Sequence, residues 1–137
     1  MHGVQGTVVG PVGPGDTAIL PDGSKSGGHL NIVLCEPAGL DDKVILVNVI
    51  TYRKRWQDST TVLKRGDHSR IKEPLIVYYE NATLVRMRDV EKLFATNRRA
   101  EKLTPDVFER VLKGLEESPH TPPEILDLYR EATQTKD

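Results

Sequence analysis

Runs of apolar residues that favour β-strands alternate with turn-forming residues over the first two thirds of the chain. The longest run, residues 43–51, is apolar on both faces, so we expect a central buried strand there. Shorter runs rich in β-branched and aromatic residues predict further strands. These lie at residues 17–20, 29–35, 60–63, 75–79 and 82–87. Residues 80 and 81 are expected to bend one long ladder of strand pairs.

From residue 88 onward the apolar positions recur at helical spacing. Val90 and Phe94 belong to a short stripe that predicts a helix. Thr104 supplies an N-cap for a second helix with a proline at its first position, and its stripe runs to residue 115. Thr121 starts a capping box and a third helix that extends to residue 134. Strands followed by helices predict one α+β domain with a small, strongly bent sheet or partly open barrel.

Composition indicates a single cytoplasmic domain. The 137 residues are 37% hydrophobic and 28% charged, which suits one globular unit. No apolar run approaches the roughly 20 residues of a membrane span, so we expect no membrane contact. The first six residues lack the charged and apolar regions of a signal peptide. The single cysteine, Cys35, cannot form an internal disulfide, which favours a reducing cytoplasm.

Charge is unevenly distributed although the net charge is only −1. Residues 51–73 contain seven Lys or Arg residues and three acids, whereas residues 101–137 contain five bases and nine acids. A basic middle segment can attract phosphate groups. The candidate nucleic-acid contacts in it are Arg53, Lys54, Arg55, Arg70 and Lys72.

Residues 66–72 combine side chains that serve in proton transfer. An opening glycine permits a tight turn and strand-like runs lie on both sides, so we expect a loop presented by the sheet. In the catalytic interpretation, His68 is the acid or base, Asp67 orients the imidazole, and Lys72 or Arg70 holds a phosphate. In the structural interpretation, the same side chains form a solvated turn.

Motifs for several other chemistries are missing from the sequence. It contains no phosphate-binding loop, no Gly-x-Ser-x-Gly nucleophile elbow and no deaminase zinc signature. The four histidines are widely separated and none shares a short motif with cysteine, so we expect neither a metal nor another cofactor. RNA cleavage by attack of the ribose 2′-hydroxyl remains open, because a base, an acid and a cation suffice for it.

The order of the elements resembles the MazF/PemK (Kid-type) family of toxin endoribonucleases from type II toxin–antitoxin systems. The similar segments are the strand at 15–20, the loop and strand at 23–34, the central strand at 44–51, the strand pair at 75–87 and the helix at 103–115. The resemblance implies an SH3-like barrel of about five to seven strands with C-terminal helices packed on it. It also implies a homodimer that cleaves single-stranded RNA without metal and is blocked by an antitoxin polypeptide.

The expected layout is one domain spanning residues 1–137. Residues 1–14 form an irregular segment, residues 15–87 the barrel and residues 88–134 the helical part. Two residues take functional positions of the family: Thr51 lies where its catalytic Thr or Ser lies, and Glu80 lies near an acid that some members use. Two of the family's arginines are replaced, by Leu30 and Tyr78.

These replacements leave two hypotheses for the function. In the first, the chain is an endoribonuclease with His68 as proton-transfer group, Lys72 and Arg53 as phosphate contacts, Thr51 as a positioning hydroxyl and His29 as a further substitute. In the second, the barrel has lost its chemistry and binds nucleic acid or protein. A third interpretation is a structural protein that uses the helices at 104–134 as its contact surface.

Overall fold

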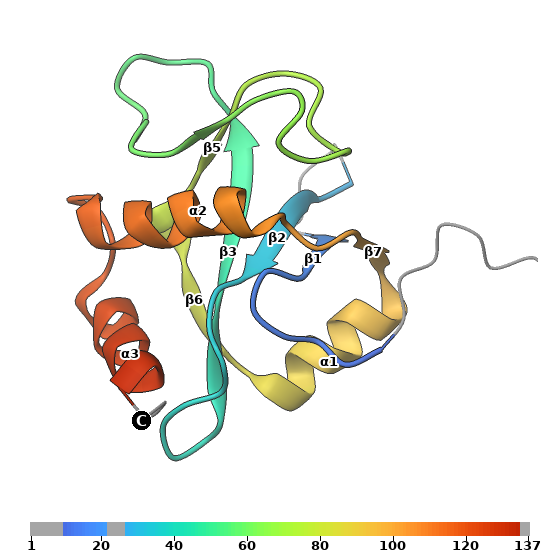
Figure 1. Cartoon of the computed structure of the whole chain (residues 1–137), viewed down its shortest axis with the longest axis vertical. Coiled ribbons are helices and arrows are strands. Elements are labelled where there is room, and N and C mark those ends of the chain that lie inside the picture. The colour runs from blue at the N-terminus through green and yellow to red at the C-terminus, as the bar shows by residue number, and fades with distance from the viewer. Residues whose placement is uncertain (1–9, 22–26, 135–137) are drawn as a thin grey trace, which may run out of the picture.

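The computed structural model describes residues 10–21 and 27–134 of the chain (Figure 1). This part contains seven strands, three α-helices and one 3-10 turn. In chain order they are β1 (Thr17–Leu20), β2 (His29–Val33), β3 (Lys43–Thr51), β4 (Val62–Leu63), β5 (Leu75–Val77), η1 (Tyr79–Asn81), β6 (Thr83–Arg86), α1 (Met87–Thr96), β7 (Arg98–Ala100), α2 (Pro105–Glu117) and α3 (Pro123–Gln134). Residues 10–14 contain no helix or strand, and residues 1–9 of the segment predicted to be irregular lie outside the described residues.

The seven strands form one antiparallel, bent sheet centred on β3 (Figure 1). The strand order is β4-β5-β3-β2-β1-β7. Because β3 is long, two strands share one of its edges: β6 pairs with its first half and β5 with its last residues. The turn η1 joins those two strands, where the sequence predicts a bend. The prediction of an α+β domain with a bent sheet and C-terminal helices is confirmed, but the described sheet is open and does not close into a barrel.

The helices cover the sheet with the apolar stripes that the sequence predicts. α2 crosses in front of the sheet (Figure 1) and buries Val107, Val111 and Leu115. α3 buries Ile125 and Leu128 in the same way. These side chains join the inner faces of β2, β3 and β5 in one apolar core, whose burial is the main stabilising term for a domain of this size.

At Gly114, α2 lies close to Thr61 and Tyr79, two residues that flank the strands β4 and β5. The enclosed hydroxyl of Tyr79 donates to the carbonyl of Val111 (2.7 Å) and accepts from the hydroxyl of Thr61 (2.7 Å). Burial raises the pKa of Tyr79, so the phenol stays neutral and keeps its proton for this bond. A Cβ atom on Gly114 would overlap the hydroxyl oxygens of Thr61 and Tyr79. Glycine at this position therefore allows α2 to dock on the sheet.

Several elements differ from the predicted ones. Arg98–Ala100 form β7, which the sequence pattern does not predict, because a three-residue strand with two arginines shows no alternation of polar and apolar residues. This strand is instead defined by its antiparallel pairing with β1, in which Ala100 lies opposite Thr17. The predicted strand at 60–63 is reduced to Val62–Leu63, and the strand at 75–79 ends at Val77. In the part of the chain described here, no helix combines the length and the apolar character that crossing a membrane requires.

Candidate nucleic-acid interface

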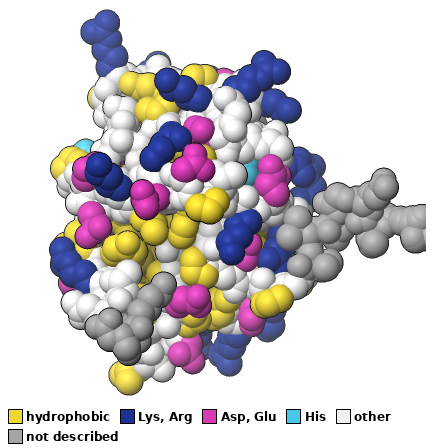
Figure 2. Space-filling model, in the orientation of Figure 1, with side chains coloured by type: hydrophobic (Ala, Val, Ile, Leu, Met, Phe, Trp, Pro, Cys, Tyr) yellow, Lys and Arg dark blue, Asp and Glu magenta, His cyan; other side chains and the backbone are white. Residues whose placement is uncertain are grey.

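Two loops bring the basic middle of the chain to one end of the molecule. The first follows β3 and spans residues 52–61, and the second joins β4 to β5 and spans residues 64–74 (Figure 1). The backbone N–H of Tyr52 donates to the carbonyl of Pro74 (3.1 Å), which ties the start of the first loop to the end of the second. Lys and Arg side chains protrude at this end of the protein (Figure 2).

The first five residues of the first loop, which we call the basic–aromatic loop, are Tyr52, Arg53, Lys54, Arg55 and Trp56. The Trp56 side chain is 81% exposed and Tyr52 is 37% exposed, whereas large aromatic rings are highly buried on average. The ammonium of Lys54 lies 5.6 Å from the centre of the Trp56 ring, within the range of a cation–π contact. The loop thus presents two aromatic rings and three cations to solvent.

The side chain of Gln57 shapes the backbone of this loop. Its Oε1 accepts from the N–H groups of Arg53 and Lys54 (2.7 Å each), and its Nε2 donates to the carbonyl of Thr51 (3.2 Å). One amide therefore satisfies three backbone groups of a tight loop that has no strand partner. The side chains of residues 53–56 are left exposed as a consequence.

Asp58 anchors the other side of the same loop to α2. Its carboxylate accepts from the hydroxyl of Ser118 (2.5 Å) and from the N–H and hydroxyl of Thr60 (3.0 and 2.5 Å). Burial acts to raise the pKa of Asp58, but the bonds from Ser118 and Thr60 outweigh it and the pKa lies below its usual value. The carboxylate stays ionised and holds the loop in place.

The structure places His68 inside the protein, which corrects the expectation that it faces a substrate. Its side chain is only 1% exposed. The ring Nδ1 accepts from the backbone N–H of Arg70 (3.0 Å), so the proton lies on Nε2, which donates to the carbonyl of Glu101 (2.9 Å). The Thr17 hydroxyl donates to that carbonyl as well (2.7 Å). Both ring nitrogens are engaged. The imidazole joins the second loop to β1, through the Thr17 hydroxyl 3.2 Å from Nε2, and to the segment after β7.

Asp67 does not orient the imidazole, contrary to the prediction. Its carboxylate accepts from the backbone N–H of Lys64 (2.8 Å) and pairs with the guanidinium of Arg110 on α2 (3.3 Å). Burial acts to raise the pKa of Asp67, but the bonds from Lys64 and Arg110 outweigh it and lower the pKa. Arg110 also donates to the carbonyl of Val62 (2.9 Å), so this pair fastens the second loop to α2.

Arg70 and Lys72 have exposed side chains on the second loop, as expected for phosphate contacts. Between His68 and Arg70, the hydroxyl and N–H of Ser69 donate to the carboxylate of Glu101 (2.5 and 3.1 Å). The hydroxyl bond is the main cause of the lowered pKa of Glu101. Glu101 thus fixes the backbone of the second loop through Ser69, while the side chains of Arg70 and Lys72 remain in solvent.

The remaining predicted catalytic residues lie on three different elements, β3, η1 and β2. Thr51 ends β3 directly before the basic–aromatic loop. Glu80 is exposed in η1. The N–H of Tyr78, directly before η1, donates to the carbonyl of Asn48 on β3. Asn48 lies three residues before Thr51, which is about 10 Å along the strand. His29 begins β2 opposite Leu20, and the register of β2 on β3 continues toward Ile50, so His29 lies near the end of β3 where Thr51 is found. The ring nitrogens of the enclosed His68 are bonded to Arg70 and Glu101 and not to any of these residues.

The sequence analysis named the three cations of the basic–aromatic loop but missed its aromatic residues. The signal was available, because Tyr52 and Trp56 flank the cations directly and Trp56 is the only tryptophan of the chain. The roles of Gln57 and Arg110 had no comparable signal, since each depends on partners that the fold brings together.

No family model matches the chain, and no curated protein is similar to it. Among the described residues, no three His, Cys, Asp or Glu side chains are grouped closely enough to hold a metal ion.

Proposed function

We propose that the chain binds single-stranded RNA through the basic–aromatic loop, with Arg70 and Lys72 as further phosphate contacts. The observation that carries this proposal is the exposed Trp56 ring among three cations. Stacking of an unpaired base on an exposed aromatic ring contributes about 1–3 kcal/mol and tolerates any base sequence. A duplex offers no free base face, so the loop favours a single strand.

The electrostatics of the two loops support the same proposal. Residues 51–73 contain seven Lys or Arg residues and only three acids. Two of these acids, Asp58 and Asp67, are tied to α2 residues or to the loop's own backbone by the bonds described above. The seven cations are exposed. When Lys and Arg side chains neutralise phosphates, counterions bound to the nucleic acid are released, and this release favours binding most strongly at low salt.

We further propose that the chain is of the MazF/PemK type, with an open, bent sheet in place of the closed SH3-like barrel that the resemblance implies. What supports this is the order of the elements, with a long central strand, a pair of strands on its edge and a closing helix at α2. Under this proposal the chain acts in the cytoplasm as a homodimer, and an antitoxin polypeptide is its protein partner.

RNA cleavage is the second candidate function. It is favoured by the corner where Thr51 ends β3, because the bond there joins Tyr52, the neighbour of Arg53, to Pro74, two residues after Lys72. A hydroxyl and two cations can hold a phosphate there and stabilise developing charge. Cleavage also needs an acid and a base, and the histidine expected to serve is enclosed and fully bonded. RNA binding without cleavage is therefore the better supported of the two.

A binding experiment with a labelled single-stranded RNA of mixed sequence tests the proposal. We expect saturable binding that weakens with added salt, weaker binding of the matched duplex, and full-length RNA on a denaturing gel. Trp56→Ala should lower the affinity about tenfold or more, while Trp56→Phe keeps most of it. Lys92→Ala, an exposed change on α1, is the matched control. Equal affinity of Trp56→Ala and wild type would refute the proposal, and RNA fragments would favour the second candidate.

A further inference from the structure

A cavity lies between α2 and the end of the first loop, and we call it the α2 pocket. It has a volume of about 220 Å³ and is lined by Thr60, Thr61, Val62, Arg110, Lys113 and Glu117. Two bonds described above fix its walls. Asp58 holds the first loop to Ser118 at the end of α2, and Arg110 holds the start of β4 through the carbonyl of Val62 (2.9 Å).

The α2 pocket is within reach of a strand that is bound to the basic–aromatic loop. Thr60, on the wall of the pocket, follows Trp56 by four residues, which span at most about 14 Å when fully extended. Both loops lie on the same side of α2 (Figure 1). Single-stranded sites on OB-fold proteins cover about 4–16 nucleotides, so a strand stacked on Trp56 is long enough to enter the pocket.

Lys113 and Glu117 bring opposite charges to the α2 pocket without neutralising each other. They are exposed and lie four residues apart on α2, a spacing at which side chains can pair. Lysine precedes glutamate here, however, which is the less favourable order. Within the described part of the chain, neither side chain forms an ion pair within 4.0 Å. The ammonium and the carboxylate are therefore both available to a ligand.

This mixture of charges suits a nucleobase better than a phosphate, which would meet a like charge at Glu117. In a single strand, the Watson–Crick edge of a base is free to bond with side chains. On this edge guanine presents two adjacent donors, N1–H and the N2 amine, next to the acceptor O6. A carboxylate can accept from both donors at once while a lysine donates to O6. Adenine, cytosine and uracil each offer a single donor group on the same edge.

We propose that the α2 pocket is a guanine site that gives the RNA-binding surface a base preference. The carboxylate of Glu117 accepts from N1–H and the N2 amine, the ammonium of Lys113 donates to O6, and the methyl groups of Thr60 and Val62 contact the ring. The inference rests on the proposed RNA binding and adds specificity to it, because stacking on Trp56 alone tolerates any base.

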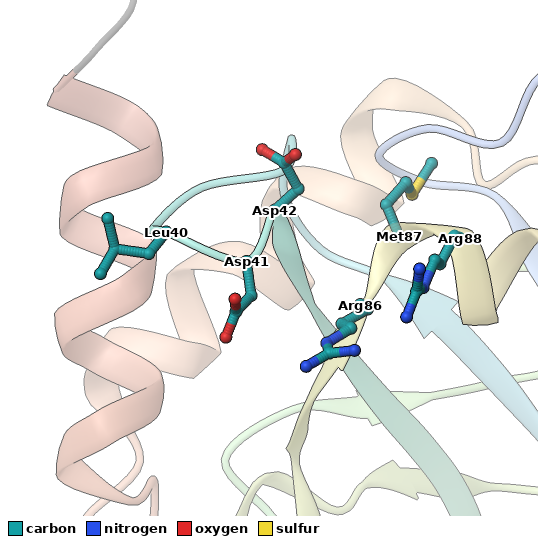
Figure 3. A pocket seen from close by; sticks show the side chains of 6 residues that line it. All are labelled: Leu40, Asp41, Asp42, Arg86, Met87 and Arg88. Atoms are coloured by element: carbon teal, nitrogen blue, oxygen red, sulfur yellow. The ribbon is translucent and has the colours of Figure 1, made fainter.

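A larger cavity, of about 370 Å³, also mixes charges but lies at the other end of β3. It is lined by Leu40, Asp41, Asp42, Arg86, Met87 and Arg88. Asp41 and Arg86 point into the same space there (Figure 3). The nine residues of β3 span about 30 Å, so a base next to Trp56 has no short path to this cavity. Asp41 therefore serves as a control for the loss of an acid elsewhere on the surface.

Titrations with four single-stranded RNAs of about twelve nucleotides test the guanine site. The strands share one sequence of adenine and uracil and differ only at a central position, which is guanine, inosine, cytosine or adenine. The guanine strand should bind about tenfold or more tightly than the cytosine and adenine strands. Inosine lacks the N2 amine, so its strand should fall between them.

Glu117→Ala should remove the preference for guanine while the adenine strand binds at least as well as to wild type, because an acid is lost. Two controls lose the same charge. Glu116→Ala changes an exposed neighbour on α2 that does not line the pocket, and Asp41→Ala changes the larger cavity. Both should keep the wild-type preference, and circular dichroism checks that every variant is folded.

The outcomes separate the guanine site from the proposed function. Equal affinity for the four strands, tighter binding of the cytosine strand, or a preference that survives Glu117→Ala would overturn the guanine site and leave RNA binding standing. Failure of every strand to bind would overturn both.

Discussion

Replacing Gly114 by alanine adds one methyl group where α2 meets the sheet. In an exposed helix this change stabilises by about 1 kcal/mol, because alanine is the better helix former. Here the new methyl would occupy the space of the Thr61 and Tyr79 hydroxyls. Tyr79 is fully enclosed and its hydroxyl is bonded to the Val111 carbonyl, so neither side chain can move without losing a buried hydrogen bond.

The expected loss follows from these contacts. Leaving the buried Tyr79 and Thr61 hydroxyls without a partner costs about 1–3 kcal/mol each. Forcing a methyl into a packed core costs a further 1–3 kcal/mol or so. After the gain in helix propensity, Gly114→Ala should lower the free energy of unfolding by about 2–8 kcal/mol, a large part of the roughly 5–15 kcal/mol typical of a domain.

Urea unfolding followed by far-ultraviolet circular dichroism measures this effect. Lys113→Ala, on the exposed side of the same helix turn, controls for helix propensity and should be nearly neutral. In a Thr61→Ala/Tyr79→Phe background, which removes both hydroxyls, adding Gly114→Ala should cost far less than in wild type. A Gly114→Ala protein as stable as wild type, or an equal cost in both backgrounds, would show that the contact is not tight.

Three further predictions concern His68, Glu101 and Cys35. His68→Ala removes the partner of the part-buried N–H of Arg70 and should lower the free energy of unfolding by about 1–3 kcal/mol in urea titrations, with unchanged RNA affinity. Lost RNA affinity in a folded protein would restore a functional role for the ring. The bond from Ser69 lowers the pKa of Glu101 in the folded protein below its value in the unfolded chain. The ionised Glu101 therefore stabilises the fold above about pH 4.3, and this stabilisation is lost as the pH falls through the folded-state pKa. The melting temperature of Glu101→Gln should consequently depend less on pH between about pH 4.5 and 2, and a profile parallel to wild type would count against the bond. Burial raises the pKa of Cys35, so a thiol reagent at pH 8 should label the folded chain far more slowly than the urea-unfolded chain; equal rates would contradict its burial.

Much of the fold could be predicted from local patterns. The apolar run of β3 and the capped stripes of α2 and α3 each contain their own signal, and all three elements are present. β7 could not be found in this way, since Arg98 and Arg99 become a strand only through pairing with β1. The resemblance implies a barrel, whereas the described sheet stays open; no residue pattern decides this, because closure depends on whether the two edge strands, β4 and β7, pair with each other.

The candidate site was predicted in part. The exposed cations follow from a polar run between two strands, and Arg53 to Arg55 are exposed as expected. The residue type of His68 suggested chemistry, but its role is set by Arg70 and Glu101, and Glu101 lies more than thirty positions away. Sequence reveals which groups could react, whereas burial and hydrogen-bond partners decide which are available.

The fluorescence of Trp56 during titration with single-stranded RNA tests the central claim most directly. Trp56 is the only tryptophan, so its emission reports on the basic–aromatic loop alone. Stacking of a base on the indole should quench this emission to saturation at low salt, with less quenching at high salt and little with duplex RNA. Emission that stays unchanged at RNA concentrations well above the protein concentration would contradict the account.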